Sequence, residues 1–219
     1  MPDFEFLSDQ GILARCPEET AALGWAAAVR HAALPWVLDV VQAYTSVAVF
    51  VDPEFVSLHE ALAILSRLKP LVDCAGVGRL YHIPCCYELG LDIERIAAHA
   101  GLSPDEVAAV HASVEYTVYA IGFSPGFPYL GYLPAALCGV PRLESPRLRV
   151  EPGSVGLTGR QTGIYPEARP GGWNLIGRTP LVLVDVAAGY FPLRTGDRIR
   201  FQPISRDEFA RLQGRRLDS

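Results

Sequence analysis

Glycine and proline are concentrated in one part of this sequence, between residues 122 and 180. Of the chain's 20 Gly and 18 Pro, this segment of 59 positions contains 11 and 9. Proline removes a backbone donor and glycine weakens helices and strand interiors, so long regular elements are disfavoured there. Short strands with tight corners remain, and this pattern predicts a β-barrel or β-sandwich.

The chain before this segment alternates strand-like and helix-like runs. Helices are expected at 17–33, 57–68, 91–100 and 103–111, with N-caps at Ser57 and Ser103. A last helix is expected at 206–213. Strands are expected at 4–7, 12–15, 37–41, 46–51, 80–85, 116–121, 154–157, 181–186 and 198–201. The pattern predicts an α+β protein, with a small N-terminal α/β sandwich at 1–88 and a β-rich domain at 89–219.

Charge is distributed unevenly along the chain. The formal net charge is −5, with 15 acidic and 6 basic side chains in residues 1–112 and 9 acidic and 13 basic ones, all arginine, after them. An acidic protein is not expected to bind nucleic acid, although a local arginine face suits a carboxylate or phosphate.

Cellular location can be inferred from apolar runs and cysteines. No run of about 18 apolar residues occurs, so no membrane-spanning helix is expected. The N-terminus, MPDFEFLSDQ, lacks the order of a signal peptide. The five cysteines (16, 74, 85, 86 and 138) have no CxxC spacing, which favours reduced thiols in a cytoplasmic protein.

Residues that transfer protons or bind metals are scarce in the central segment. Residues 113–180 contain no His, Asp or Lys, which excludes a Ser-His-Asp triad and the usual zinc cluster within that block. Neither GxxxxGK[ST] nor a strand-coupled GxGxxG occurs, so no nucleotide site is indicated. His111 is expected to be a helix-end or core contact rather than a catalyst. No catalytic residue and no metal site are therefore assigned.

Several side chains in this segment can bind a ligand. Arg178 presents a planar fork suited to a carboxylate or phosphate, while Gln161 and Thr162 offer neutral hydrogen-bonding groups. Tyr165 and Trp173 can form the wall of a pocket. The alternative is that Gln161 and Thr162 satisfy buried backbone and that Trp173 belongs to the core.

The stretch GFSPGFPYLG, residues 122–131, combines glycine and proline with aromatics. Its Gly and Pro predict a rigid turn after the strand at 116–121. Such a turn would hold Phe123, Phe127 and Tyr129 at a rim shared between a pocket and a partner protein.

Three long motifs in this region resemble one known family. GFSPGFPYLG, PGSVGLTGRQTGIYP and PGGWNLIGRTP are similar to motifs of the KipI/PxpB family, also called allophanate hydrolase subunit 1-like proteins. IPCCYE, GLSPDEVAAVH and GDRIRF resemble its flanking motifs, so the resemblance covers about residues 78–204. It implies a C-terminal cyclophilin-like β-barrel behind a smaller α+β domain.

The resemblance also implies a function. Family members typically act as the B subunit of an ATP-dependent 5-oxoprolinase that opens 5-oxoproline to glutamate, together with a homologous C subunit (KipA/PxpC-like) and an A subunit (PxpA-like). ATP is then used by the complex rather than evidently bound by this chain, and the substrate is a small lactam or amide. Alternatives are a regulator that inhibits histidine kinase autophosphorylation and a carboxyltransferase-type subunit that acts on urea- or allophanate-like amides. A prolyl isomerase has only the barrel resemblance in its favour.

Overall fold

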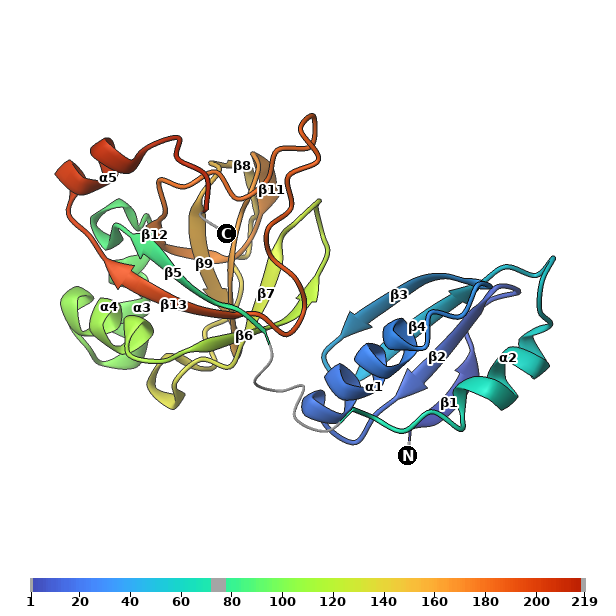
Figure 1. The fold of residues 1–219 in the computed structure, drawn as a ribbon. Coiled ribbons are helices and arrows are strands. Elements are labelled where there is room, and N and C mark those ends of the chain that lie inside the picture. The colour runs from blue at the N-terminus through green and yellow to red at the C-terminus, as the bar shows by residue number, and fades with distance from the viewer. Residues whose placement is uncertain (1, 72–77, 218–219) are drawn as a thin grey trace. The chain divides into compact units, whose positions relative to one another are not determined.

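The computed structural model describes residues 2–71 and 78–217, which form two compact units (Figure 1). The units span Met1–Gly78 and Arg79–Ser219. The sequence suggested a boundary between 88 and 89 instead. The difference arises because β5 (Leu80–Cys85) forms a parallel ladder with β13 (Arg198–Pro203) and so belongs to the second unit.

The N-terminal unit is an antiparallel sheet with two helices. Its strands are β1 (Asp3–Phe6), β2 (Gly11–Arg15), β3 (Val37–Ala43) and β4 (Ser46–Val51), in the order β1-β2-β4-β3. The helices are α1 (Glu19–His31) and α2 (Leu58–Leu65). Trp25 of α1 and Ala61 of α2 share a core with alternate residues of β4, so both helices cover one face of the sheet. The expected cap at Ser57 is confirmed, with Glu60 completing a capping box.

The C-terminal unit contains most of the short strands. Its main sheet runs β5-β13-β6-β7-β10-β9-β12, and all its pairs except β5 with β13 are antiparallel. A separate ribbon pairs β8 with β11. The strands not yet given are β6 (Tyr116–Ile121), β7 (Pro128–Gly131), β8 (Arg147–Val150), β9 (Ser154–Thr158), β10 (Gln161–Ile164), β11 (Arg169–Gly171) and β12 (Asn174–Arg178). The helical elements are η2 (Tyr87–Leu89), α3 (Ile93–Ala100), α4 (Pro104–Ala112), η3 (Ala135–Leu137) and α5 (Arg206–Leu212).

The two ends of this sheet meet at one residue pair. Cys86, directly after β5, and Arg178, at the end of β12, exchange backbone hydrogen bonds of 2.8 and 3.0 Å. Gly177 allows the approach, because a Cβ there would lie 2.6 Å from the Sγ of Cys85. In the described residues the closing contact is a single bridge rather than a ladder, and a closed barrel is not found. The fold is α+β, with a mostly antiparallel sheet and few helices.

One predicted strand is wrong. Residues 181–186 form only isolated bridges, Val182 with Arg216 and Asp185 with Tyr190, because among the described residues no neighbouring strand lies in register beside them; Leu181 and Leu183 pack on the core. The capping box that begins α4 at Ser103 is confirmed. Among the described helices, none is long and apolar enough to cross a bilayer. Cys16, Cys85, Cys86 and Cys138 are free thiols, and Cys74 lies outside the described residues.

Candidate substrate-binding site

Five aromatic residues singled out in the sequence form one cluster. The ring of Phe127 lies 5.2 Å from that of Tyr165 and 5.6 Å from that of Trp173, in edge-to-face contacts. Tyr129 packs on Phe127 at 4.9 Å, and Phe123 on Phe127 at 5.4 Å. Phe127, Tyr165 and Trp173 are buried, Tyr129 is half-buried, and Phe123 is 60% exposed. Phe127 is therefore a core residue and not a rim residue, and Phe123 is the member of this cluster that reaches furthest into solvent.

The turn that presents Phe123 is held by its own backbone. Gly122 N–H donates to the carbonyl of Phe127 at 3.1 Å, and Phe127 N–H donates to the carbonyl of Ser124 at 3.1 Å. Phe123 has a φ of +66°, a left-handed conformation that a bulky side chain rarely adopts. The expected turn after the strand at 116–121 is present, and it places Phe123 in a sparsely populated backbone region.

A close contact joins two of the sequence motifs. A Cβ on Gly171 would lie 2.4 Å from the hydroxyl oxygen of Tyr165, so only glycine admits the tyrosine ring at this position. Burial raises the pKa of Tyr165, and the positive charges of Arg142 and Arg147 partly oppose this effect. The hydroxyl therefore stays protonated at neutral pH. The motif around Tyr165 and the motif around Trp173 form one packed unit.

Thr162 and Gln161 belong to the framework of this unit. Thr162 is fully buried, and its hydroxyl donates to the carbonyl of Gly156 at 3.0 Å. The same oxygen lies 3.0 Å from Nε2 of His111, whose Nδ1 lies 2.7 Å from the hydroxyl of Tyr87. Thr162 thus faces the interior and satisfies buried groups, while Gln161, at the start of β10, is half-buried.

His111 is a core contact, as the sequence suggested. Its side chain is fully buried, and desolvation lowers its pKa to about 3. The imidazole is therefore neutral at physiological pH. Because the Thr162 hydroxyl already donates to Gly156, Nε2 of the imidazole carries the proton and Nδ1 accepts from Tyr87. This chain of hydrogen bonds joins η2, α4 and β10.

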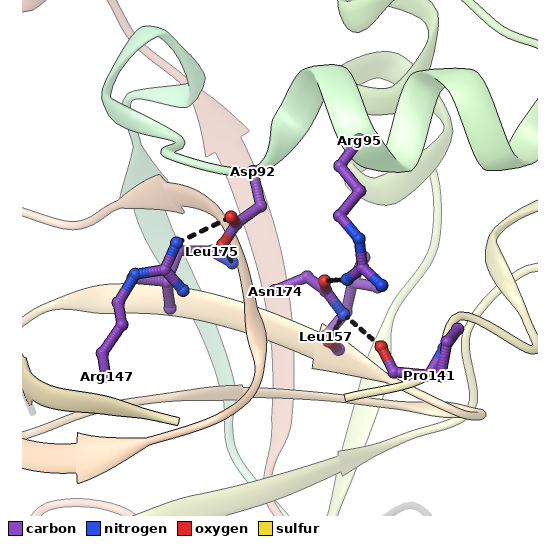
Figure 2. A network of polar contacts seen from close by, with 7 residues as sticks. All are labelled: Asp92, Arg95, Pro141, Arg147, Leu157, Asn174 and Leu175. Atoms are coloured by element: carbon purple, nitrogen blue, oxygen red, sulfur yellow. Dashed lines mark hydrogen bonds and ion pairs between the residues drawn. The ribbon is translucent and has the colours of Figure 1, made fainter. Parts of the chain in front are cut away.

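An ion pair that the sequence did not suggest holds β12 in place (Figure 2). Asp92 is 8% exposed, and its carboxylate accepts from Nη2 of Arg147 at 2.7 Å. The other carboxylate oxygen accepts from the backbone N–H of Leu175 at 2.7 Å. Asp92 directly precedes α3, in the N-cap position, where aspartate is common in any helix. The residue type at this position therefore does not indicate a partner on β8.

Asn174 forms a second junction beside this ion pair (Figure 2). Its side chain is fully buried and donates to the carbonyls of Pro141 and Leu157 at 2.9 and 3.2 Å. Its side-chain oxygen accepts from Arg95 of α3. All groups of the amide are thus engaged with protein, so Asn174 positions the strand that leads to Arg178.

Arg178 lies apart from the aromatic cluster, beside a cavity of about 260 Å³. Its Nε donates to the carbonyl of Pro152 at 2.8 Å, and its guanidinium carbon lies 5.9 Å from the centre of the Phe209 ring. Arg178 is the ionisable residue among those that line the cavity in the described part of the chain. The other lining includes Pro152, Pro166, Thr179, Pro180, Phe209 and Gln213. The arrangement can bind a small anion against apolar walls.

In residues 2–71 and 78–217, no group of three or more His, Cys, Asp and Glu side chains lies close enough together to hold a metal ion. Of the eight predicted site residues, five form the aromatic cluster, Gln161 and Thr162 lie on the strand β10 with Thr162 turned toward His111, and Arg178 lies at the separate cavity. The neighbouring residues that the sequence analysis missed are Asp92, Arg95, Arg147 and Phe209.

The chain belongs to the carboxyltransferase-domain family, because a family model described as "Carboxyltransferase domain, subdomain C and D" matches residues 2–191. Its relatives include the B subunit of 5-oxoprolinase from Bacillus subtilis (strain 168), which is 39% identical over 199 residues, covering 84% of this chain and 82% of that protein. The protein of the same name from Escherichia coli O157:H7 is 43% identical over 183 residues, covering 82% and 84%. These matches confirm the family resemblance seen in the sequence motifs.

Solved structures share the fold. The crystal structure of TTHA0988 matches with a TM-score of 0.80 at 38% identity, covering 89% of this chain and 40% of that chain. This chain therefore corresponds to less than half of TTHA0988. Urea carboxylase of Kluyveromyces lactis matches with a TM-score of 0.71 at 18% identity, covering 96% of this chain and 22% of that chain. The latter likeness concerns the fold alone.

Proposed function

We propose that this chain is the B subunit of an ATP-dependent 5-oxoprolinase, which adds water across the lactam bond of 5-oxoproline to give glutamate. The observation that carries the proposal is the name shared by three relatives, at 39%, 43% and 40% identity over most of the chain. Because that name describes one component of a larger enzyme, it supports a complex. The partners we propose are an A subunit, together with a homologous C subunit.

In the proposed division of labour, this chain binds the substrate, and its partners transfer protons and use ATP. Two observations support it. The ionisable residue lining the Arg178 cavity is a guanidinium, which binds anions but does not exchange protons at neutral pH. The imidazole of His111 is sealed in the core, where it cannot reach a substrate.

Reconstitution tests this function. The purified chain should release no glutamate from 5-oxoproline and ATP, whereas a mixture with its A and C partners should release glutamate and ADP together. Glutamate is measured by coupled dehydrogenase assay, and omission of each component in turn is the control. Turnover by the isolated chain would contradict the division of labour, and an inactive complete mixture would contradict the function.

A role in carboxyl transfer is the second candidate, because the matching family model bears that name. The same reconstituted mixture should then consume ATP with urea or allophanate when bicarbonate is supplied as the source of the carboxyl group. Activity with 5-oxoproline and none with the two amides supports the first proposal over this one.

We also propose that the C-terminal unit is related to a cyclophilin-like barrel, in which the two ends of the sheet approach each other at Cys86 and Arg178 without forming a closed ladder among the described residues. The two backbone hydrogen bonds between these residues support this description, because they join the last strand of the sheet to the first. Phe123, as the exposed end of the aromatic cluster, is the residue we propose for a partner contact.

A further inference from the structure

We propose that the cavity beside Arg178 binds the carboxylate of a small ring acid, and that helix α5 is a strap forming its movable wall. The identity of the acid as 5-oxoproline rests on the proposed function. The cavity and the guanidinium belong to residues 152–214, and the strap is held by contacts with Cys85 and Glu88.

The first argument is the chemistry of the cavity. The hydrogen bond from Nε to Pro152 fixes the guanidinium, and among the described residues neither Nη atom has a hydrogen-bond partner. Glu151 is close enough to feel the charge of Arg178, but its carboxylate is paired with Arg149 at 2.7 Å. The two Nη groups are therefore available to a carboxylate from outside, in the bidentate geometry that guanidinium favours.

The second argument is the shape of the walls. Pro152, Pro166 and Pro180 provide rigid apolar surfaces, and the ring of Phe209 faces the guanidinium. The proline side of this cavity of about 260 Å³ suits a compact ring better than a flexible chain, because the prolines lose little conformational freedom on binding. Thr179 and Gln213 add neutral polar groups that suit an amide.

The third argument is the attachment of α5, which is pinned at its ends and loosely held between them. At its start, Ile204 N–H donates to the carbonyl of Cys85 at 3.0 Å. After its end, Gly214 N–H donates to the carbonyl of Pro180 at 3.0 Å. None of the residues of α5 is buried, and Figure 1 shows the helix at the edge of its unit, beyond β13. Such a segment can move at low free-energy cost.

The fourth argument is the side-chain contact made by Arg206, the first residue of the strap. Arg206 donates to the side chain and the carbonyl of Glu88 at 3.0 and 2.9 Å. This pair is solvent-exposed and so contributes little to stability, which suits a latch that opens. Glu88 lies two residues after Cys86, the backbone partner of Arg178. The latch and the anion-binding guanidinium are therefore fixed to the same short segment.

Ligand titration of the purified full chain tests the binding site. Three probes are used: 5-oxoproline, cyclopentanecarboxylate and the uncharged 2-pyrrolidone, with binding followed by NMR. Both acids should bind, and 2-pyrrolidone should bind at least tenfold more weakly. Arg178→Gln should weaken both acids by about thirtyfold, the effect of losing a charge-assisted pair. The matched control is Arg169→Gln, an exposed ion-paired arginine of the same unit, which should bind as the unmodified chain does.

A second variant separates shape from charge. Phe209→Ala should weaken the ring acids by about tenfold and leave acetate binding unchanged, a selectivity that general unfolding would not produce. Equal affinities for 2-pyrrolidone and the acids, or equal affinities of Arg178→Gln and Arg169→Gln, would overturn the site.

Hydrogen exchange tests the strap. Saturation with 5-oxoproline should slow exchange of the α5 amides at least tenfold, and Glu88→Gln should speed their exchange in the free chain. Unchanged exchange on saturation would overturn the strap. In the reconstituted complex, a KM for 5-oxoproline unaffected by Arg178→Gln would overturn the site while the function stands. Ring-acid binding that depends on Arg178, without 5-oxoprolinase activity, would overturn the function while the site stands.

Discussion

Replacing Asp92 with alanine is expected to lower the free energy of unfolding of the C-terminal unit by about 3 kcal/mol. The change leaves the guanidinium of Arg147, which is 26% exposed, without its carboxylate, and it removes the acceptor of the Leu175 N–H. The Leu175 N–H is buried and the Arg147 guanidinium is only partly exposed, so water cannot fully replace the lost carboxylate at either group. Hydrogen exchange of the β9 and β12 amides, measured against urea in the full chain, reports the local free energy.

The pair of Arg149 and Glu151 provides the matched control, because it lies on and beside the same strand but is largely solvent-exposed. Glu151→Ala should cost about 0.5 kcal/mol or less. If the two alanine variants prove equally stable, the ion pair of Asp92 does not anchor β12 as the structure indicates.

The stability of the chain is expected to fall by about 2 kcal/mol between pH 7 and pH 5 through His111 alone. Burial lowers the pKa of this imidazole to about 3 in the folded chain, whereas an unfolded histidine has a pKa of about 6.5. Between these values the unfolded chain binds a proton that the folded chain does not, so stability is lost as pH falls from about 6.5 toward 3. Burial keeps the pKa of Tyr87 and of Tyr116 above the usual range, so neither neighbour titrates in this window.

A comparison of variants separates the pH dependence caused by His111 from the pH dependence caused by the Asp and Glu side chains of the chain. His111→Gln should be less stable than the unmodified chain at pH 7, and the difference should shrink by about 2 kcal/mol at pH 5. Thr162→Val is the control: it removes one hydrogen bond to the imidazole but leaves it buried, so its difference should stay constant with pH. Urea unfolding at pH 7 and pH 5 measures the stability difference of each variant from the unmodified chain. A constant difference for His111→Gln would show that the imidazole is charged or exposed when folded.

Features with local causes were predictable from the sequence. The first turns of the helices after Ser57 and Ser103 were predictable because each serine is followed three residues later by a glutamate, and both capping boxes form. The turn after β6 follows from the glycines and prolines of residues 122–131. The family is recognisable for a similar reason, since its motifs are continuous stretches of chain.

Features that depend on distant partners were not predictable in the same way. An apolar run at 181–186 resembles a strand, but a strand needs a neighbour in register, and only isolated bridges form there. Phe127 was expected at a rim, whereas it is buried and four other aromatic side chains pack against it. The position of the domain boundary was missed because β5 finds its partner near the end of the chain, in β13.

By itself, the sequence determined the α+β class and the residue types available for binding, and it indicated that residues 122–180 are rich in short strands, although it placed only the one at 154–157. Only the tertiary structure decided that Thr162 faces His111, that Asp92 pairs with Arg147, and that Arg178 faces a cavity beside α5. The physical reason is that caps, turns and apolar periodicity act over a few residues. Side-chain partners separated by tens of residues are instead selected by register and packing, which exist only once the sheet has formed.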